Sequence, residues 1–233
     1  MNDLKILNIR DWIAYLLPGG VMLLAIVLFF DRMELDPGPV LKGLFQNQFL
    51  AIVSAIAFAY TLGQAATWLG TVLLIRPAER ILGSPAKYLL AAETRAKRRL
   101  RLPLDDLDPS IKDAMRATFQ SEWSAGIIDT EESVVHLCQS YLLGQAPEAY
   151  LGLITRLFAL YQFYSALILP AAAVMILFPS PSTLLQVLAA LVVAALLFRG
   201  AWWYWTTWHK YLFLYSWREL ARKREHGSAD EGS

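Results

Sequence analysis

The chain has 233 residues, of which 56% are hydrophobic, and its formal net charge at pH 7 is +1. This apolar fraction is above that of an average soluble domain and suits several membrane spans with a modest soluble part. The small net charge excludes a partner selected by bulk charge alone. A single cysteine, Cys138, excludes a disulfide within the chain and is compatible with a reducing compartment.

The first predicted span covers residues 12–30. It contains Pro18-Gly19-Gly20, which should bend or interrupt the helix. Basic residues precede this run, as in a signal peptide, but no small-residue cleavage pattern follows it, so we expect a retained span. Residues 4–17 can form a short helix at the membrane surface, and residues 31–48 should form a loop.

The second predicted span, residues 49–75, contains no charged residue. At about 1.5 Å per residue it measures about 40 Å and must tilt or protrude. Its polar residues recur with a seven-residue period. They are Ser54, Thr61, Gln64, Trp68 and Thr71, with Ala57 completing the series. Either this stripe packs inside a helical bundle, which we favour because hydroxyls and amides join membrane helices, or it lines a wet path in an oligomer.

A helical insert without a span, residues 76–156, separates this pair of spans from the second pair. Within it we expect helices over residues 85–101, 109–122 and 131–144, and from residue 147 onward. Asp108 followed by Pro109 is a favourable helix start. No alternating run indicates a strand.

The third and fourth predicted spans lie within residues 157–206. The third is 157–178, and the fourth can be capped by Thr183. The uninterrupted apolar part of the fourth span is short, so we expect an aromatic belt and a snorkelling arginine to complete it at the interface. These interface residues are Arg199, Trp202, Trp203 and Trp205. Beyond them, residues 207–233 should form a juxtamembrane helix that ends near residue 225, followed by a disordered tail from 226.

Basic residues indicate the orientation. Segments 1–11, 76–156 and 199–233 hold 2, 11 and 6 of the 21 Lys and Arg, whereas the opposite side holds only Arg32 and Lys42. The positive-inside rule therefore places both termini and the insert in the cytoplasm, and we expect the protein in the inner (cytoplasmic) membrane.

Basic and acidic residues are segregated within the insert. Residues 76–101 carry eight basic residues against two acidic ones, whereas residues 102–150 carry two basic against nine acidic. The densest basic cluster is Arg95, Lys97, Arg98, Arg99 and Arg101. The two halves can pair with each other, the basic half can lie on anionic lipid, or the cluster can bind a nucleotide or oligonucleotide. Pairing and lipid contact are favoured over the anionic ligand.

The spans lack the groups that many chemistries need. Residues 49–75, 157–178 and 184–198 contain no Asp, Glu, Lys, Arg or His, which disfavours coupled transport and intramembrane proteolysis. No metal-ligand spacing, phosphate-binding loop or nucleophile motif is present, so we expect no enzyme activity, no cofactor and no metal. An acidic run that ends at Asp108 is interpreted as a helix entry rather than a cation site. His136 and Cys138 should diverge on their helix.

Four short segments resemble small bacterial multi-span membrane proteins of phage-defence operons. They are Trp12-Ile-Ala-Tyr-Leu-Leu-Pro-Gly19, Tyr60-Thr-Leu-Gly63, Arg76-Pro-Ala-Glu-Arg80, and Tyr150 with Arg156-Leu-Phe-Ala-Leu-Tyr-Gln-Phe163. The resemblance implies a membrane effector or sensor that acts beside a cytosolic partner, which makes or senses a nucleotide signal.

Together these features predict an all-α polytopic protein with four transmembrane helices and a cytoplasmic helical domain, which forms homo-oligomers in the lipid bilayer. The leading functional hypothesis is a channel-like or membrane-permeabilising effector of phage defence, controlled through the insert by a partner protein or nucleotide-type signal. The competing hypothesis is a non-conducting scaffold or sensor that docks a soluble partner protein.

Replacing the five residues of the basic cluster with Gln should lower the affinity of the chain for a fluorescent oligonucleotide at least roughly tenfold at low salt. Fewer phosphate contacts should also flatten the salt dependence, measured by anisotropy. Replacing Lys112 and Arg116 in the acidic half provides the control. An unchanged affinity of the five-residue variant would remove the cluster as a binding surface.

Overall fold

A computed structural model describes residues 12–34, 48–85, 107–123, 131–145, 147–178 and 182–230. All regular secondary structure in these ranges is helical. The four helices that are long and apolar enough to cross a membrane span Ala14–Arg32, Gln48–Leu82, Glu148–Leu177 and Thr183–Arg224. The predicted all-α class and the four candidate spans are therefore confirmed, while insertion and orientation stay predictions.

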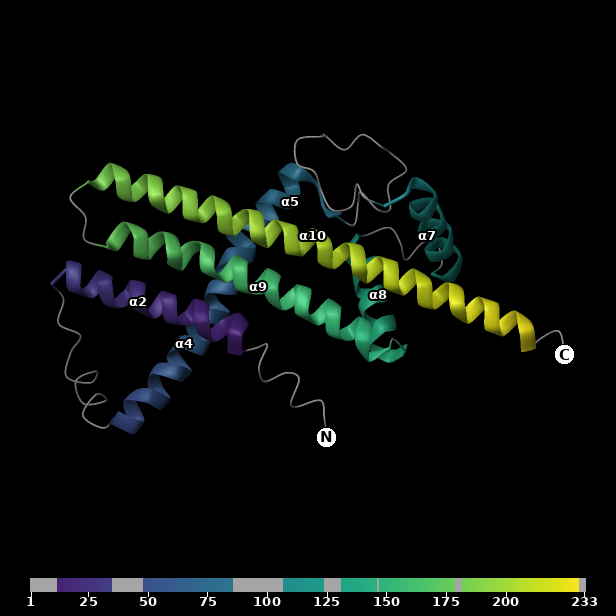
Figure 1. Cartoon of the computed structure of the whole chain (residues 1–233), viewed down its shortest axis with the longest axis horizontal. Coiled ribbons are helices and arrows are strands. Elements are labelled where there is room, and N and C mark those ends of the chain that lie inside the picture. The colour runs from purple at the N-terminus through teal and green to yellow at the C-terminus, as the bar shows by residue number, and fades with distance from the viewer. Residues whose placement is uncertain are drawn as a thin grey trace. The chain divides into compact units, whose positions relative to one another are not determined.

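The chain divides into two compact units (Figure 1). Unit 1 consists of Met1–Pro77 and Ala159–Trp202, and unit 2 consists of Ala78–Phe158 and Trp203–Ser233. Helix α9 (Glu148–Leu177) and helix α10 (Thr183–Asp230) contribute residues to both units.

Unit 1 contains the N-terminal hairpin and the apolar parts of α9 and α10. Its other elements are the π-helical turn η1 (Trp12–Leu16), α2 (Leu17–Arg32), α4 (Gln48–Gly70) and the π-helical turn η2 (Thr71–Ile75). Helix α4 crosses α2 obliquely (Figure 1), while its tilt against a membrane stays a prediction. The helical path continues from η1 into α2, since Leu16 keeps a right-handed helical backbone, so the expected interruption of the first span is a change of helix type and not a break. Pro18 lies in the first turn of α2 and has no N–H to donate to the preceding turn.

Backbone-to-backbone contact at glycines holds α4 in place. A Cβ atom on Gly19 of α2 would lie 1.5 Å from the carbonyl oxygen of Ala59, and one on Gly63 would lie 1.9 Å from the carbonyl oxygen of Tyr15. On the α9 side, a Cβ atom on Gly70 would lie 2.2 Å from the carbonyl oxygen of Ser165. Only glycine permits these distances, so the small residues of α4 fix where it crosses both neighbours.

Polar contacts close the opposite end of unit 1. The Arg32 guanidinium donates hydrogen bonds to the carbonyl oxygens of Ile176 at 3.0 Å and Leu177 at 3.4 Å. These carbonyls belong to the last turn of α9, where a cation also interacts favourably with the helix dipole. The first and third candidate spans therefore end side by side, as four alternating crossings require.

The turn between α9 and α10 is closed by side chains. Buried Gln186 donates its amide to the carbonyl of Phe178. The Leu185 amide donates to the Ser182 hydroxyl at 3.4 Å, so Ser182 and not the expected Thr183 caps α10. Thr183 is already the first helical residue.

The described residues of unit 2 form three further helices. They are α5 (Arg76–Leu82, which begins in unit 1), α7 (Pro109–Glu122) and α8 (Glu131–Gln145). The last two match the expected ranges to within one residue. Helix α10 extends to Asp230, so the tail predicted to be disordered from 226 is helical for five further residues. These residues, His-Gly-Ser-Ala-Asp, include only one strong helix former, Ala229, and they continue the helix of the Lys, Arg and Glu residues that precede them. The predicted helix 85–101 lies outside the described residues from residue 86 onward.

A matched pair of adjacent glycines tests the crossing of α2 and α4. Gly19→Ala should destabilise the protein by roughly 1–3 kcal/mol, because the new methyl group meets the Ala59 backbone. Gly20→Ala should be neutral or slightly stabilising, because nothing lies within 4 Å of a Cβ there and alanine favours helix. Thermal aggregation of the detergent-solubilised variants, followed by size-exclusion chromatography, measures both. Equal midpoints would contradict the close crossing.

Candidate functional site

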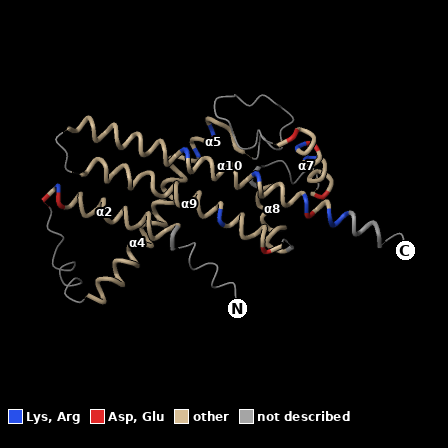
Figure 2. The backbone as a smooth tube through the Cα atoms, viewed as in Figure 1, with Lys and Arg blue, Asp and Glu red and all other residues tan. Residues whose placement is uncertain are grey.

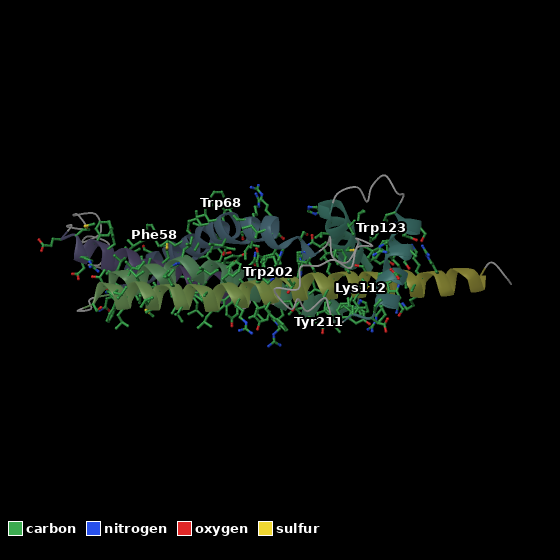
Figure 3. The ribbon with its side chains drawn as sticks, turned by 90° about the horizontal axis from the view of Figure 1, so that it is seen from above. Phe58, Trp68, Lys112, Trp123, Trp202 and Tyr211 are labelled. Atoms are coloured by element: carbon green, nitrogen blue, oxygen red, sulfur yellow. The ribbon has the colours of Figure 1, made fainter. Side chains whose placement is uncertain are left out.

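Helix α4 has two faces of different character. Its buried face consists of Ala59, Gly63, Ala66, Thr67 and Gly70, which pack towards α2 and α9. On the other side, Ala57, Thr61, Gln64 and Trp68 are exposed, while Ser54 and Thr71 are half-buried. We call the six residues Ser54, Ala57, Thr61, Gln64, Trp68 and Thr71 the outer stripe. Figure 3 shows Trp68 directed away from the helices.

The described part of the chain therefore leaves the middle of the outer stripe uncovered. Trp68 is 64% exposed, although its large ring would favour a packed position. Sequence reasoning favoured packing of the stripe inside a bundle, whereas four of its residues are exposed in one copy. The period did not fix the direction, because several faces of a nearly apolar helix are equally compatible with burial. The small-residue face contacts the neighbouring helices, and this leaves the stripe outside.

Most threonine hydroxyls on α4 and η2 have hydrogen-bond partners inside unit 1. The Thr61 and Thr67 hydroxyls donate to the carbonyls of Ala57 and Gly63, each at 2.9 Å. At the end of the stripe, the Thr71 hydroxyl lies 3.1 Å from the Tyr161 hydroxyl. Gln64 differs, because its carboxamide is exposed and the described part of the chain shows no hydrogen bond to it.

The four predicted interface residues are not equivalent in the structure. Arg199 and Trp203 are exposed. Trp202 is only 5% exposed and stacks on Phe198, with ring centroids 6.3 Å apart. Consecutive helical residues point about 100° apart, so a run of aromatic residues cannot all face the same side. The interface role of the four residues stays a prediction.

Trp205 joins two segments of unit 2. It is half-buried, and its Nε1–H donates to Glu79 Oε1 at 2.7 Å. This hydrogen bond ties the start of the unit 2 part of α10 to α5. Sequence reasoning did not predict this hydrogen bond, because 126 residues separate Trp205 from Glu79.

Aromatic rings on α10 form the core of unit 2. His209 is 2% exposed and lies edge-on to the rings of Trp205 and Trp208, at centroid distances of 4.2 and 4.7 Å. Further along, Phe213 contacts Phe119 of α7 at 6.2 Å. Sequence reasoning assigned no role to His209; the tryptophans one and four residues before it on the same helix were the available signal.

Cys138 is an inert core residue. It is fully buried, and burial raises the pKa of its thiol to about 12. The thiol therefore stays protonated at neutral pH and is a poor nucleophile or metal ligand. His136 is exposed, so the two side chains diverge as predicted. Among the described residues, no group of three or more His, Cys, Asp and Glu is placed to hold a metal ion.

Helix α7 is fixed at both ends. At its start, the Asp108 carboxylate accepts hydrogen bonds from the Ser110 hydroxyl at 2.7 Å and the Ser110 amide at 2.8 Å, and these bonds lower the pKa of Asp108. Asp108 thus caps a helix, as interpreted from the sequence.

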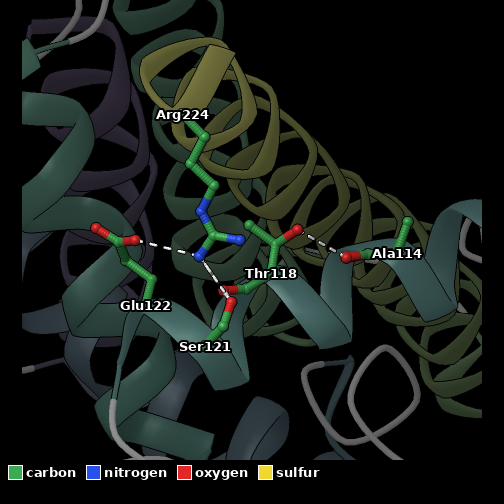
Figure 4. Close-up of polar contacts among 5 residues, drawn as sticks. All are labelled: Ala114, Thr118, Ser121, Glu122 and Arg224. Atoms are coloured by element: carbon green, nitrogen blue, oxygen red, sulfur yellow. Dashed lines mark hydrogen bonds and ion pairs between the residues drawn. The ribbon is translucent and has the colours of Figure 1, made fainter. Parts of the chain in front are cut away.

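At the other end of α7, Arg224 of α10 reaches the last turn (Figure 4). Its guanidinium donates to the Ser121 hydroxyl at 2.6 Å, to Glu122 Oε2 at 3.3 Å and to the Thr118 carbonyl at 3.5 Å. A cation at this position satisfies terminal acceptors and complements the helix dipole. Arg224 therefore holds the end of α7 against α10.

The predicted ligand-binding cluster, Arg95 to Arg101, lies outside the described residues, as do Asp105 and Asp106. The chain matches no protein-family model, no curated protein and no solved structure. The resemblance to membrane proteins of phage-defence operons accordingly stays a prediction.

Arg224→Gln should weaken the attachment of α7 to α10. The pair is partly exposed, so we expect a loss of about 1 kcal/mol, equivalent to roughly fivefold faster amide exchange in α7. Lys223→Gln, which removes a neighbouring exposed charge from the same helix, is the control. Hydrogen–deuterium exchange followed by mass spectrometry compares the two, and equal exchange in α7 would show that Arg224 does not hold it.

Proposed function

We propose that this protein is an oligomeric effector of the bacterial inner membrane that permeabilises the bilayer in response to a cytosolic signal. In this proposal unit 1 spans the membrane, while unit 2 and both termini lie in the cytoplasm. The outer stripe of α4 carries the proposal. A polar, uncovered face on a span without charges suits a helix that assembles with others around a path across the membrane.

The charge distribution supports the same arrangement. The described helices of unit 1 carry Lys, Arg, Asp and Glu only near their ends, except for Arg199, which lies close to the end of the unit 1 part of α10 (Figure 2). Such helices tolerate hydrocarbon along their length, and no ionisable group is available at depth to couple a substrate to protons. A passive path that opens between subunits needs neither a coupling site nor a catalytic group.

Unit 2 supplies the regulatory part of the proposal. A partner protein or nucleotide-type signal acts on the segment 76–156, which includes the basic cluster. We propose that the signal acts on the last turn of α7, because this turn is held to α10 by a partly exposed ion pair between Glu122 and Arg224. The role in phage defence rests on the sequence resemblance alone.

The alternative is a non-conducting scaffold. Leu143 of α8 in unit 2 is 75% exposed, and it lies outside the four candidate spans. A single exposed leucine is common on protein surfaces, so Leu143 supports this alternative only if a partner protein covers it. In this alternative the protein recruits a soluble partner and conducts nothing.

Dye release from vesicles distinguishes the two functions. Full-length protein reconstituted with phosphatidylethanolamine and phosphatidylglycerol should release carboxyfluorescein when cytosolic extract from phage-infected cells is added, because the signal opens the assembly. Release should rise more steeply than linearly with the protein-to-lipid ratio, since several copies act together. Protein-free vesicles treated with the same extract are the control. Retention of the dye at every ratio, with and without extract, would contradict the permeabilising function and favour the scaffold.

A further inference from the structure

The outer stripe has the spacing of a helix–helix contact. Its six members are separated alternately by three and four residues from Ser54 to Thr71. This is the pattern of the contacting positions in a left-handed pair of helices, which keeps the same face against a partner over many turns. Residues that only face lipid have no need of such a period.

Gln64 lies at a depth where its carboxamide needs a protein partner. It precedes Arg76 by twelve residues, which is roughly 18 Å along a helix and near the middle of a hydrocarbon layer of about 30 Å. Lipid tails offer no hydrogen-bond donors or acceptors there. The buried face of α4 is already occupied by its contacts with α2 and α9, and none of the described residues bonds to Gln64, so a residue of a second copy would supply the partner that its carboxamide needs.

We propose that the outer stripe of α4 is the contact surface for a second copy of this chain, in which the two Gln64 carboxamides bond to each other. This inference rests on the proposed membrane insertion and names the partner that the proposed oligomer requires. The proposed contact between two α4 helices belongs to the assembly before any signal acts on it.

Membrane insertion explains why like residues meet. All copies enter the bilayer in the same direction, so neighbouring α4 helices are parallel and related by rotation about the membrane normal. Each residue of the outer stripe then faces the same residue in the neighbouring copy. A carboxamide is both donor and acceptor and therefore complements itself, which a carboxylate or an ammonium group does not. Ala57 and Thr61 are small enough for the helices to come close.

Cysteine crosslinking tests the orientation of the contact. Thr61→Cys lies on the stripe, whereas Ile52→Cys, nine residues away, points to the opposite side of α4 and is also exposed, at 60%. Oxidation of native membranes should give a disulfide-linked dimer with Thr61→Cys and none with Ile52→Cys. The parent chain controls for Cys138, whose buried thiol should not react. Equal yields at the two positions would overturn the proposal, and so would a disulfide to a different protein at Thr61→Cys.

A second substitution tests the role of the amide. Adding Gln64→Leu to Thr61→Cys should lower the dimer yield roughly threefold to tenfold, because the interhelical hydrogen bond is lost while the apolar surface increases. Trp68→Cys is an independent reporter on the same stripe and should show the same loss. An unchanged yield at both reporters would overturn the Gln64 contact. If disulfide-linked dimers form but no dye is released from vesicles, the α4 contact is supported and the permeabilising function is contradicted. A failure of the contact can therefore be told apart from a failure of the proposed function.

Discussion

The contact of α4 with α2 and α9 through glycine determines the rest of unit 1. At Gly19, Gly63 and Gly70 the helices come so close that backbone atoms occupy the space of a side chain. Without a hydrophobic driving force between helices in lipid, such contacts are a main source of association energy, because every backbone atom at the crossing gains dispersion contacts. They also fix the rotation of α4 about its own axis, since only one side of the helix is free of large side chains.

The direction of the polar stripe follows from that rotation. Once the small residues face inward, Thr61, Gln64 and Trp68 must face outward. A polar face turned to hydrocarbon is costly unless another protein surface covers it. In the proposed membrane setting, the same glycines that assemble one copy of the chain leave the outer stripe uncovered, and the proposed contact with a second copy depends on this link.

Unit 2 is organised by a different force. Its core is aromatic, with His209 held edge-on between two tryptophan rings and Phe213 packed on Phe119. Ring contacts of this kind give more stabilisation than area alone. Helix α7 shares this core through Phe119, which is 1% exposed, and a cap at Asp108 and the ion pair of Arg224 with Glu122 complete its attachment. Surface ion pairs are weak, so the buried ring of Phe119 contributes more to this attachment than the ion pair does.

The sequence by itself determined the helical class, the four apolar segments, and the ranges of α7 and α8. These depend on composition, periodicity and capping residues that are close together in the chain. The tertiary structure alone decided which face of α4 is buried, that Trp202 points inward while Trp203 points outward, and that Glu79 receives Trp205. Those features depend on contacts between segments far apart in sequence. An almost uniformly apolar helix carries little pattern from which its orientation can be predicted.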